Sequence, residues 1–217
     1  MARMKRISKL WIVLGMVYAA FIAWHEPLRT PLSEDEVRAA FGGQYAQIRQ
    51  SQDEQALAFL DFFLTDDGRP FFMVNLNALP KQTPDVEEAA RQYGTFMMTQ
   101  LLPRASYPVM STDVITGLTN SLGADLTPFE RLVVVRYRSR RDFLEIVASS
   151  EFRQEVRKKG ASLDGWYSAP STIGPTLSPP VLALCFLLFV GVIGTLRARP
   201  RSHANGQRND PDASRRL

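Results

Sequence analysis

The chain has 217 residues, of which 45% are hydrophobic, and a formal net charge of +4. The positive charge lies at the two ends, because the 20 acidic residues outnumber the 16 basic ones between residues 25 and 176. A folded domain without excess positive charge is not expected to bind nucleic acid, which is therefore excluded as a predicted partner. The single cysteine, Cys185, excludes an internal disulfide.

The first predicted element is a transmembrane helix over residues 10–26, which follows a basic cytoplasmic N-terminus at residues 1–9. The segment lacks the small-x-small pattern of a signal-peptidase site, so we expect an uncleaved signal anchor. A cleaved signal peptide is the alternative. Gly15, Ala19 and Ala23 recur every four residues and form a small-residue face that predicts close approach of another transmembrane helix.

Residues 27–69 are predicted to form a helical extension. Ser33 with Glu36, and Ser51 with Glu54, have the spacing of two capping boxes, in which each side chain satisfies the other's free backbone donor. Gly42 and Gly43 break the helical pattern between them. After the second box, apolar residues at helical spacing predict one buried helix face: Ala56, Leu57, Leu60, Phe63 and Leu64.

Residues 70–171 have the pattern of an α+β domain. The predicted strands cover 71–79, 107–118, 132–138 and 163–168, with a loop at 119–130. The predicted helices cover 83–102 and 139–160, the second capped by Ser139 and restarted at Ser149. The order β-α-β-β-α-β predicts a ferredoxin-like fold.

Two segments of this domain resemble a known family. The sequence RLVVVRYRSRRDFLEIVASSEFRQEVRKKGASLDGWYSAPS, residues 131–171, is similar to the C-terminal half of a domain-of-unknown-function family in the dimeric α/β-barrel superfamily. FMVNLNAL, residues 72–79, resembles the first strand of that family, and Tyr93 lies where the family has a tyrosine. The resemblance implies a homodimer in which two four-stranded sheets close into a barrel. It implies no activity, since the family has none assigned.

A linker at residues 172–178 leads to a second predicted transmembrane helix at 179–196 and a disordered basic cytoplasmic tail at 197–217. Because basic residues flank the outer side of both apolar runs, we expect both termini in the cytoplasm and the main domain outside it. The lipid bilayer is then a predicted partner. Both runs are short for a bilayer, and a buried core helix is the alternative interpretation.

The middle of the chain has no cysteine and no histidine expected in its interior. His25 is predicted at the membrane boundary and His203 in the tail. This argues against thiol catalysis, Ser-His chemistry, and zinc or haem ligation by the domain. We therefore expect no cofactor and no metal.

Five residues are predicted to line a ligand site. Asn75 and Asn77 share one face of the first strand, and with Arg136, Tyr93 and Trp166 they are predicted to place polar groups in a mostly apolar barrel cleft. Such a composition is typical of a pocket for a small apolar ligand. The alternative is that the amides and the guanidinium satisfy strand ends or the dimer seam.

Two classes of function follow. The first, which needs fewer assumptions, is a membrane-tethered module without catalysis that dimerises or binds a small ligand. The second is a cofactor-independent enzyme of the oxygenase or isomerase type that works in the barrel cleft. A closed pocket with Asn75 and Arg136 pointing into it favours the enzyme, and a filled barrel favours the module.

Overall fold

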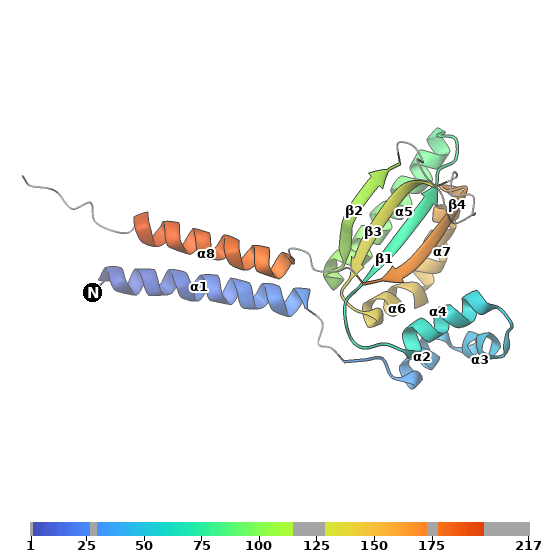
Figure 1. Ribbon diagram of the computed structural model, residues 1–217, viewed down its shortest axis with the longest axis horizontal. Coiled ribbons are helices and arrows are strands. Elements are labelled where there is room, and N and C mark those ends of the chain that lie inside the picture. Colours follow the sequence, from blue (N-terminus) through green and yellow to red (C-terminus); the bar gives the residue numbers. More distant parts are fainter. Residues whose placement is uncertain (1, 27–29, 115–128, 173–177, 198–217) are drawn as a thin grey trace, which may run out of the picture. The chain divides into compact units, whose positions relative to one another are not determined.

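The computed structural model describes residues 2–26, 30–114, 129–172 and 178–197 (Figure 1). The predicted loop at 119–130 lies mostly outside the described residues, as do nearly all of the linker and the C-terminal tail. The chain divides into two compact units, one containing most of the two apolar helices and the other running from Ala20 to Pro180. Each unit is described by itself below.

A four-stranded antiparallel sheet forms the centre of the larger unit. Its strands are β1 (Phe71–Ala78), β2 (Tyr107–Asp113), β3 (Phe129–Tyr137) and β4 (Gly165–Ser171), in the order β2-β3-β1-β4. Helix α5 (Pro84–Leu101) and the short η1 (Leu102–Arg104) connect β1 to β2, and α6 (Arg140–Ala148) and α7 (Ser150–Ala161) connect β3 to β4. This connectivity and strand order are those of the split β-α-β arrangement. The predicted α+β class and order of elements are confirmed.

Two strand boundaries differ from the prediction. β3 begins at Phe129, so Glu130 belongs to the strand rather than to the preceding loop. β4 runs from Gly165 to Ser171, a shift toward the C-terminus. Both ends follow from pairing with β1: Ala78 lies opposite Phe129 on one side and opposite Gly165 on the other. Pairing with a neighbouring strand extends β3 beyond the limits that residue propensity alone indicates.

The two faces of the sheet have different surroundings. Residues opposite one another on antiparallel strands share a face, so Phe71 and Tyr137 lie on one side, where their rings stack at 5.1 Å. Phe143 from α6 packs on both rings, and this side holds much of the hydrophobic core. The other side, which we call the open face, has no described helix of the α5–α7 layer over it. Figure 1 shows α5 and α7 behind the sheet and the open face toward the viewer.

Local capping explains where the two helices after β3 begin. The Ser139 hydroxyl accepts a hydrogen bond from the Asp142 N–H at 3.1 Å, and the Ser149 hydroxyl accepts one from the Phe152 N–H at 3.0 Å. Each hydroxyl satisfies a backbone donor that the first helical turn leaves free. The predicted cap at Ser139 and the predicted restart at Ser149 are confirmed.

The helical extension consists of α2 (Glu34–Phe41), α3 (Gly43–Gln50) and α4 (Glu54–Leu64). The capping box of Ser33 and Glu36 is confirmed, but the second predicted box is wrong. Asp53 caps α4 instead, because its carboxylate accepts from the N–H groups of two residues of the first turn, and the helix dipole favours a negative charge there. The Ser51 hydroxyl donates to the Ile48 carbonyl.

Two arginines at the start of α6 connect the extension to the sheet domain. Arg141 pairs with Glu36, and this hydrogen-bonded pair lowers the pKa of the Glu36 carboxyl to about 2. Arg140 donates to the Phe62 carbonyl at 2.5 Å and its guanidinium lies 4.5 Å from the centre of that ring. By sequence alone, Arg140 and Arg141 are predicted to lie on a solvated helix face. The structure corrects this prediction, because both arginines contact the extension and hold α2 and α4 against α6.

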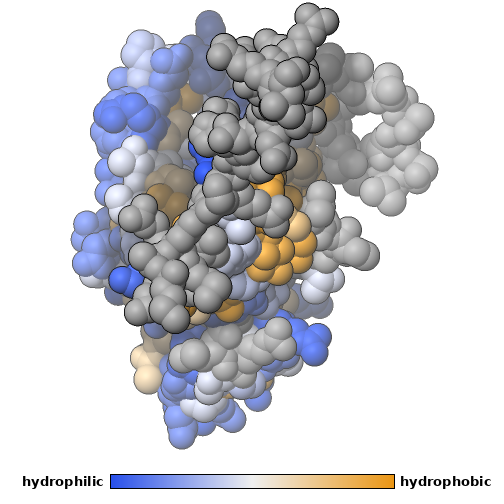
Figure 2. Space-filling model, turned by 90° about the vertical axis from the view of Figure 1, so that its left-hand side faces the viewer, coloured by the Kyte–Doolittle hydropathy of each residue, from blue (hydrophilic) through white to orange (hydrophobic). Residues whose placement is uncertain are grey.

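The smaller unit contains most of the two apolar helices, α1 (Ala2–His25) and α8 (Pro179–Arg197), which lie side by side in Figure 1. Among the described helices, only α8 is long and apolar enough to cross a membrane, and the apolar part of α1 is shorter, Lys9–His25. The prediction of a spanning helix is therefore supported for α8 alone. Figure 2 shows hydrophobic residues, in orange, at the molecular surface.

Glycines on α8 allow α1 and α8 to pack closely. A Cβ atom at Gly191 would lie 2.4 Å from the Trp11 ring, and one at Gly194 would lie 2.7 Å from a Leu10 methyl group. A side chain at either position would therefore require the Trp11 ring or the Leu10 methyl group to move. Nothing lies within 4 Å of a Cβ placed at Gly15, so the small-residue face predicted on α1 is not the one that packs within this chain.

Candidate functional site

The main departure from the sequence-based expectation is His25. It was expected at a membrane boundary, outside the folded interior, but its side chain is only 2% exposed and reaches the sheet. Its Nε2 atom lies 2.9 Å from the Tyr107 hydroxyl of β2, and its Nδ1 atom lies 3.0 Å from a carboxylate oxygen of Glu26. The statement that the domain has no interior histidine is thus wrong. No sequence signal connects His25 to Tyr107, 82 positions away.

Arg136 of β3 completes this cluster on the open face. Its Nη1 atom donates to the Ala105 carbonyl at 2.8 Å, its Nη2 atom donates to the His25 carbonyl at 3.3 Å, and the guanidinium lies 5.7 Å from the centre of the Tyr107 ring. Burial lowers the pKa of Arg136 and raises that of Tyr107. Both shifts leave the two groups in their ordinary forms at neutral pH, a charged guanidinium and a neutral phenol.

The geometry of the cluster fits one tautomer of a neutral imidazole. Nδ1–H donates to Glu26, and Nε2 accepts the proton of the Tyr107 hydroxyl. Both ring nitrogens of His25 are then satisfied, and the ring is buried. The arrangement is suited to fixing the end of α1 against β2 and β3. A histidine that served a ligand as general base would need one ring nitrogen open to that ligand.

The register of the sheet separates Arg136 from the two asparagines predicted to share its site. Arg136 lies opposite Phe72, whereas Asn75 lies opposite Val133 and Asn77 opposite Arg131. Positions that differ by an odd number along β1 lie on opposite faces. Arg136 is therefore on the open face, and both asparagines are on the helix-covered face. The five predicted ligand-binding residues do not form one cluster.

On the helix-covered face, Asn75 and Asn77 have different surroundings. The Asn75 carbonyl oxygen accepts a hydrogen bond from the Ser168 hydroxyl of β4 at 2.7 Å, and its amide nitrogen donates to the Val133 carbonyl at 3.3 Å. These contacts fit the structural alternative. Asn77 is 8% exposed, and its side-chain oxygen has no hydrogen-bond partner among the described residues. Trp166 lies opposite Asn77.

The sequence predicts Lys159 of α7 on a solvated helix face rather than at an anion site. Its ammonium group lies 5.0 Å from the centre of the Trp166 ring, and burial lowers its pKa to about 8. Tyr93 of α5 also lies in the helix layer, where burial raises its pKa to about 12. Tyr93 also contributes to the raised pKa of Tyr137, for which burial is the main cause, so it belongs to the packing between α5 and the sheet. Whether any of these residues binds a ligand stays a prediction.

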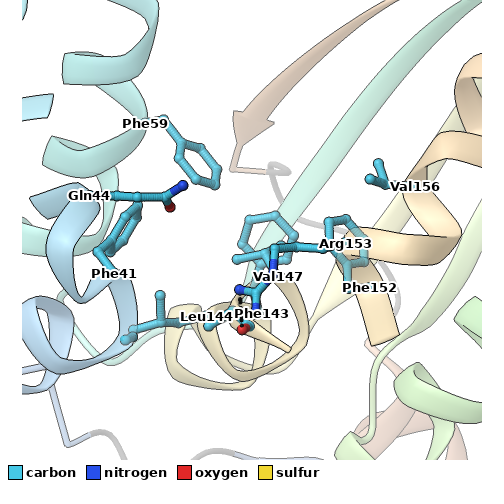
Figure 3. A pocket seen from close by; sticks show the side chains of 11 residues that line it. Phe41, Gln44, Phe59, Phe143, Leu144, Val147, Phe152, Arg153 and Val156 are labelled. Atoms are coloured by element: carbon cyan, nitrogen blue, oxygen red, sulfur yellow. Dashed lines mark hydrogen bonds between the residues drawn. The ribbon is translucent and has the colours of Figure 1, made fainter. Parts of the chain in front are cut away.

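A cavity lies elsewhere in the larger unit, between the helical extension and helices α6 and α7 (Figure 3). Its volume is about 440 Å³ and its walls are mostly apolar. It is lined by Ala40, Phe41, Gln44, Phe59, Phe143, Leu144, Val147, Ala148, Phe152, Arg153 and Val156. None of the five predicted site residues is among them. Within the described residues, no group of three or more His, Cys, Asp or Glu side chains could hold a metal.

No protein-family model matches this chain, and no curated protein matches it. Among solved structures, RPA0582 of unknown function from Rhodopseudomonas palustris shares 18% identity and a TM-score of 0.47, covering 58% of this chain and 97% of that one. SnoaB, a cofactor-independent oxygenase from Streptomyces nogalater, shares 15% identity and a TM-score of 0.35, and the match covers 50% of this chain and 97% of that one. Hydroxynitrile lyase from Passiflora edulis shares 12% identity and a TM-score of 0.36, and the match covers 51% of this chain and 98% of that one.

Proposed function

We propose that this chain is a membrane-anchored protein whose ferredoxin-like domain serves as a dimerisation or small-ligand-binding module. Two copies pair through the open faces of their sheets, as the family resemblance implies. The observation that supports this is the composition of that face. By the register of the sheet, it carries Phe72, Val74, Leu76, Met110, Leu132, Val134 and Tyr167.

This surface has the properties of an interface between copies. Met110 is 45% exposed and Tyr167 59% exposed, although both are large and lie on a sheet face that no helix of the α5–α7 layer covers. The one charged side chain that the register places on this face, Arg136, donates to carbonyls of its own chain, so it needs no charged partner. Burial of Met110, Tyr167 and the other partly exposed side chains of this face against a second copy removes apolar surface from water, which favours association. Val134, at 4% exposed, is already buried within the single chain.

A charge placed on the open face tests the pairing. We expect the full chain in detergent to have twice its monomer mass by light scattering, after subtraction of the detergent. Leu76→Glu should shift it to the monomer, because the carboxylate would have to be buried without a partner. Met98→Glu is the matched control, since Met98 lies on α5 and is 36% exposed. A monomeric wild type, or a Leu76→Glu variant that remains dimeric, would contradict the proposal.

The proposed anchor consists of α8 and of α1 as a second span, with both termini in the cytoplasm. The length and composition of α8 support the anchor. For α1, the support is its apolar stretch and the close packing of its residues Leu10 and Trp11 on α8. A reporter active only in the cytoplasm should be active when fused after Leu217 and silent when inserted after residue 121. Activity at both positions would place the domain in the cytoplasm and overturn the orientation.

A cofactor-independent enzyme is the second candidate, and Lys159 is the observation that favours it. A lysine with a pKa of about 8 is partly neutral near physiological pH and can act as a base or nucleophile. It lies beside Trp166, which is opposite Asn77 on the neighbouring strand, and the side-chain oxygen of Asn77 has no hydrogen-bond partner in the described part of the chain. If the amine is accessible, trinitrobenzenesulfonate should modify Lys159 faster at pH 7.5 than the exposed Lys81. Slower modification of Lys159 would remove the support for this candidate.

A further inference from the structure

We propose that the cavity between the helical extension and helices α6 and α7 binds a water-soluble apolar carboxylic acid, whose carboxylate pairs with Arg153. The inference rests on the ligand-binding part of the proposed function and gives that part a site. It does not depend on dimerisation, because the cavity is lined by helices and contains no residue of the sheet.

The size and the walls of the cavity suit a small apolar molecule. Its volume of about 440 Å³ is within the range of ligand pockets. Phe41 and Phe59 come from the extension, while Phe143 and Phe152 come from α6 and α7, so the ligand would contact both parts of the unit (Figure 3). The Phe59 ring is 40% exposed and lies 6.1 Å from that of Phe41 and 6.5 Å from that of Phe143. This aromatic wall is therefore in part open to water.

Arg153 is the only charged residue among the eleven that line the cavity. Its Nη1 atom donates to the Ala148 carbonyl at 2.9 Å, which fixes one side of the guanidinium (Figure 3). A guanidinium has five N–H donors. In the described part of the chain, no carboxylate lies within ion-pair distance of Arg153, which distinguishes it from Arg140 and Arg141. Its remaining donors are therefore available to an anion.

The charge and the shape together select the class of ligand. A planar guanidinium matches a carboxylate, which it can bind with two parallel hydrogen bonds. The aromatic walls favour an apolar body, and the single positive charge disfavours a cation. Gln44, on the extension, extends its amide toward the cavity in Figure 3 and offers a second hydrogen-bonding group. Because Arg153 is exposed to solvent, the acid would enter from water.

Octanoate and its neutral analogue octanamide test the charge pairing. With the full chain in nanodiscs and empty nanodiscs subtracted, calorimetry should show octanoate binding more tightly than octanamide. Arg153→Gln should weaken octanoate binding about tenfold or more and leave octanamide unchanged, because the variant removes one charge-assisted pair. Arg157→Gln is the matched control on the same helix, outside the cavity, and should change the affinity for neither octanoate nor octanamide. Octanoate affinity within twofold of wild type in Arg153→Gln would overturn the proposal.

A cavity-filling variant tests the location. Ala148→Phe should abolish binding of both probes, and Ala40→Leu provides a second filling variant if the first lowers the melting temperature strongly. Binding that survives in a folded filled variant would place the acid elsewhere and overturn the proposal, as would binding of oleate from loaded nanodiscs without any binding of octanoate. Leu76→Glu should bind octanoate as the wild type does, so loss of the dimer and loss of the ligand are separate results.

Discussion

The lysine at the end of α7 lies in surroundings that oppose its charge. The ring of Trp166, 5.0 Å away, attracts the Lys159 ammonium group, yet burial outweighs this attraction and lowers the pKa to about 8, from 10.5 in an unfolded chain. Between these two values the folded state binds fewer protons than the unfolded state. The free energy of unfolding should therefore rise with pH through this window.

This predicts a measurable change between pH 7.5 and 9.5. The tyrosines contribute equally to the wild type and to a variant that lacks only the lysine, so the difference between the two proteins reports on Lys159. The stability of the wild type should increase more over this interval than that of Lys159→Met, which has no group to titrate. Denaturant unfolding at the two pH values measures the difference. The amine should also titrate near pH 8 by carbon-13 NMR. A midpoint near 10.5, with equal pH dependence in both proteins, would show that the side chain lies in water.

The hydrogen bond between Tyr107 and His25 is expected to contribute measurably to stability. Tyr107→Phe removes the hydroxyl and leaves Nε2 of a ring that is 2% exposed without a partner. The cost should be about 1–3 kcal/mol of stability, measured by denaturant unfolding of the full chain. Ser150→Ala, which removes the hydroxyl of an exposed residue that bonds to the neighbouring Glu151, should stay within about 0.5 kcal/mol of wild type. Equal effects of the two substitutions would mean that His25 does not hold the end of α1 on the sheet.

Residue type was a good guide to local structure and a poor guide to the site. The alternation along β1 correctly placed Asn75 and Asn77 on one face. It could not show that Arg136 lies on the other, because the register between β1 and β3 sets which residues oppose each other, and a shift of one residue exchanges the faces. His25 was missed for a similar reason, since its partners come from β2 and β3.

At the scale of elements, caps and breaks were predictable where one local motif decided the outcome. Ser139 and the Ser33–Glu36 pair start their helices as expected. The predicted cap at Ser51 is wrong because Asp53, two residues later, is also a capping residue, and its carboxylate satisfies two backbone donors. The sequence contained both candidates, and the spacing of the box alone did not decide between them.

The packing of α1 on α8 can be tested with two glycine substitutions. Gly191→Leu should force the helices apart, since even a Cβ would meet the Trp11 ring at 2.4 Å, and should lower the melting temperature of the full chain in detergent. Gly15→Leu is the control, because the space around Gly15 is open, and should leave the melting temperature unchanged. If Gly15→Leu instead weakens pairing of two copies, the small-residue face of α1 contributes to association, as the sequence predicts.

At the level of the whole molecule, we propose different roles for three surfaces of the larger unit. The helix-covered face of the sheet holds the core, the open face is proposed to pair with a second copy, and the cavity beside the extension is proposed to bind an acid. The α+β architecture was predictable because the pattern of elements in the chain is regular. The cavity was not, since it is formed by side chains of α2–α4 and α6–α7 that are about 100 residues apart in sequence.

Spin-label distances between copies can show whether the open faces of two sheets pair. In a Cys185→Ser background, which removes the only native cysteine, a label at Tyr167→Cys reports on the open face and one at Arg157→Cys reports on the helix layer. In membranes, we predict an intermolecular dipolar interaction for the label at position 167, at a shorter distance than for the label at position 157. No interaction at position 167, or a shorter distance at position 157, would contradict pairing through the sheet.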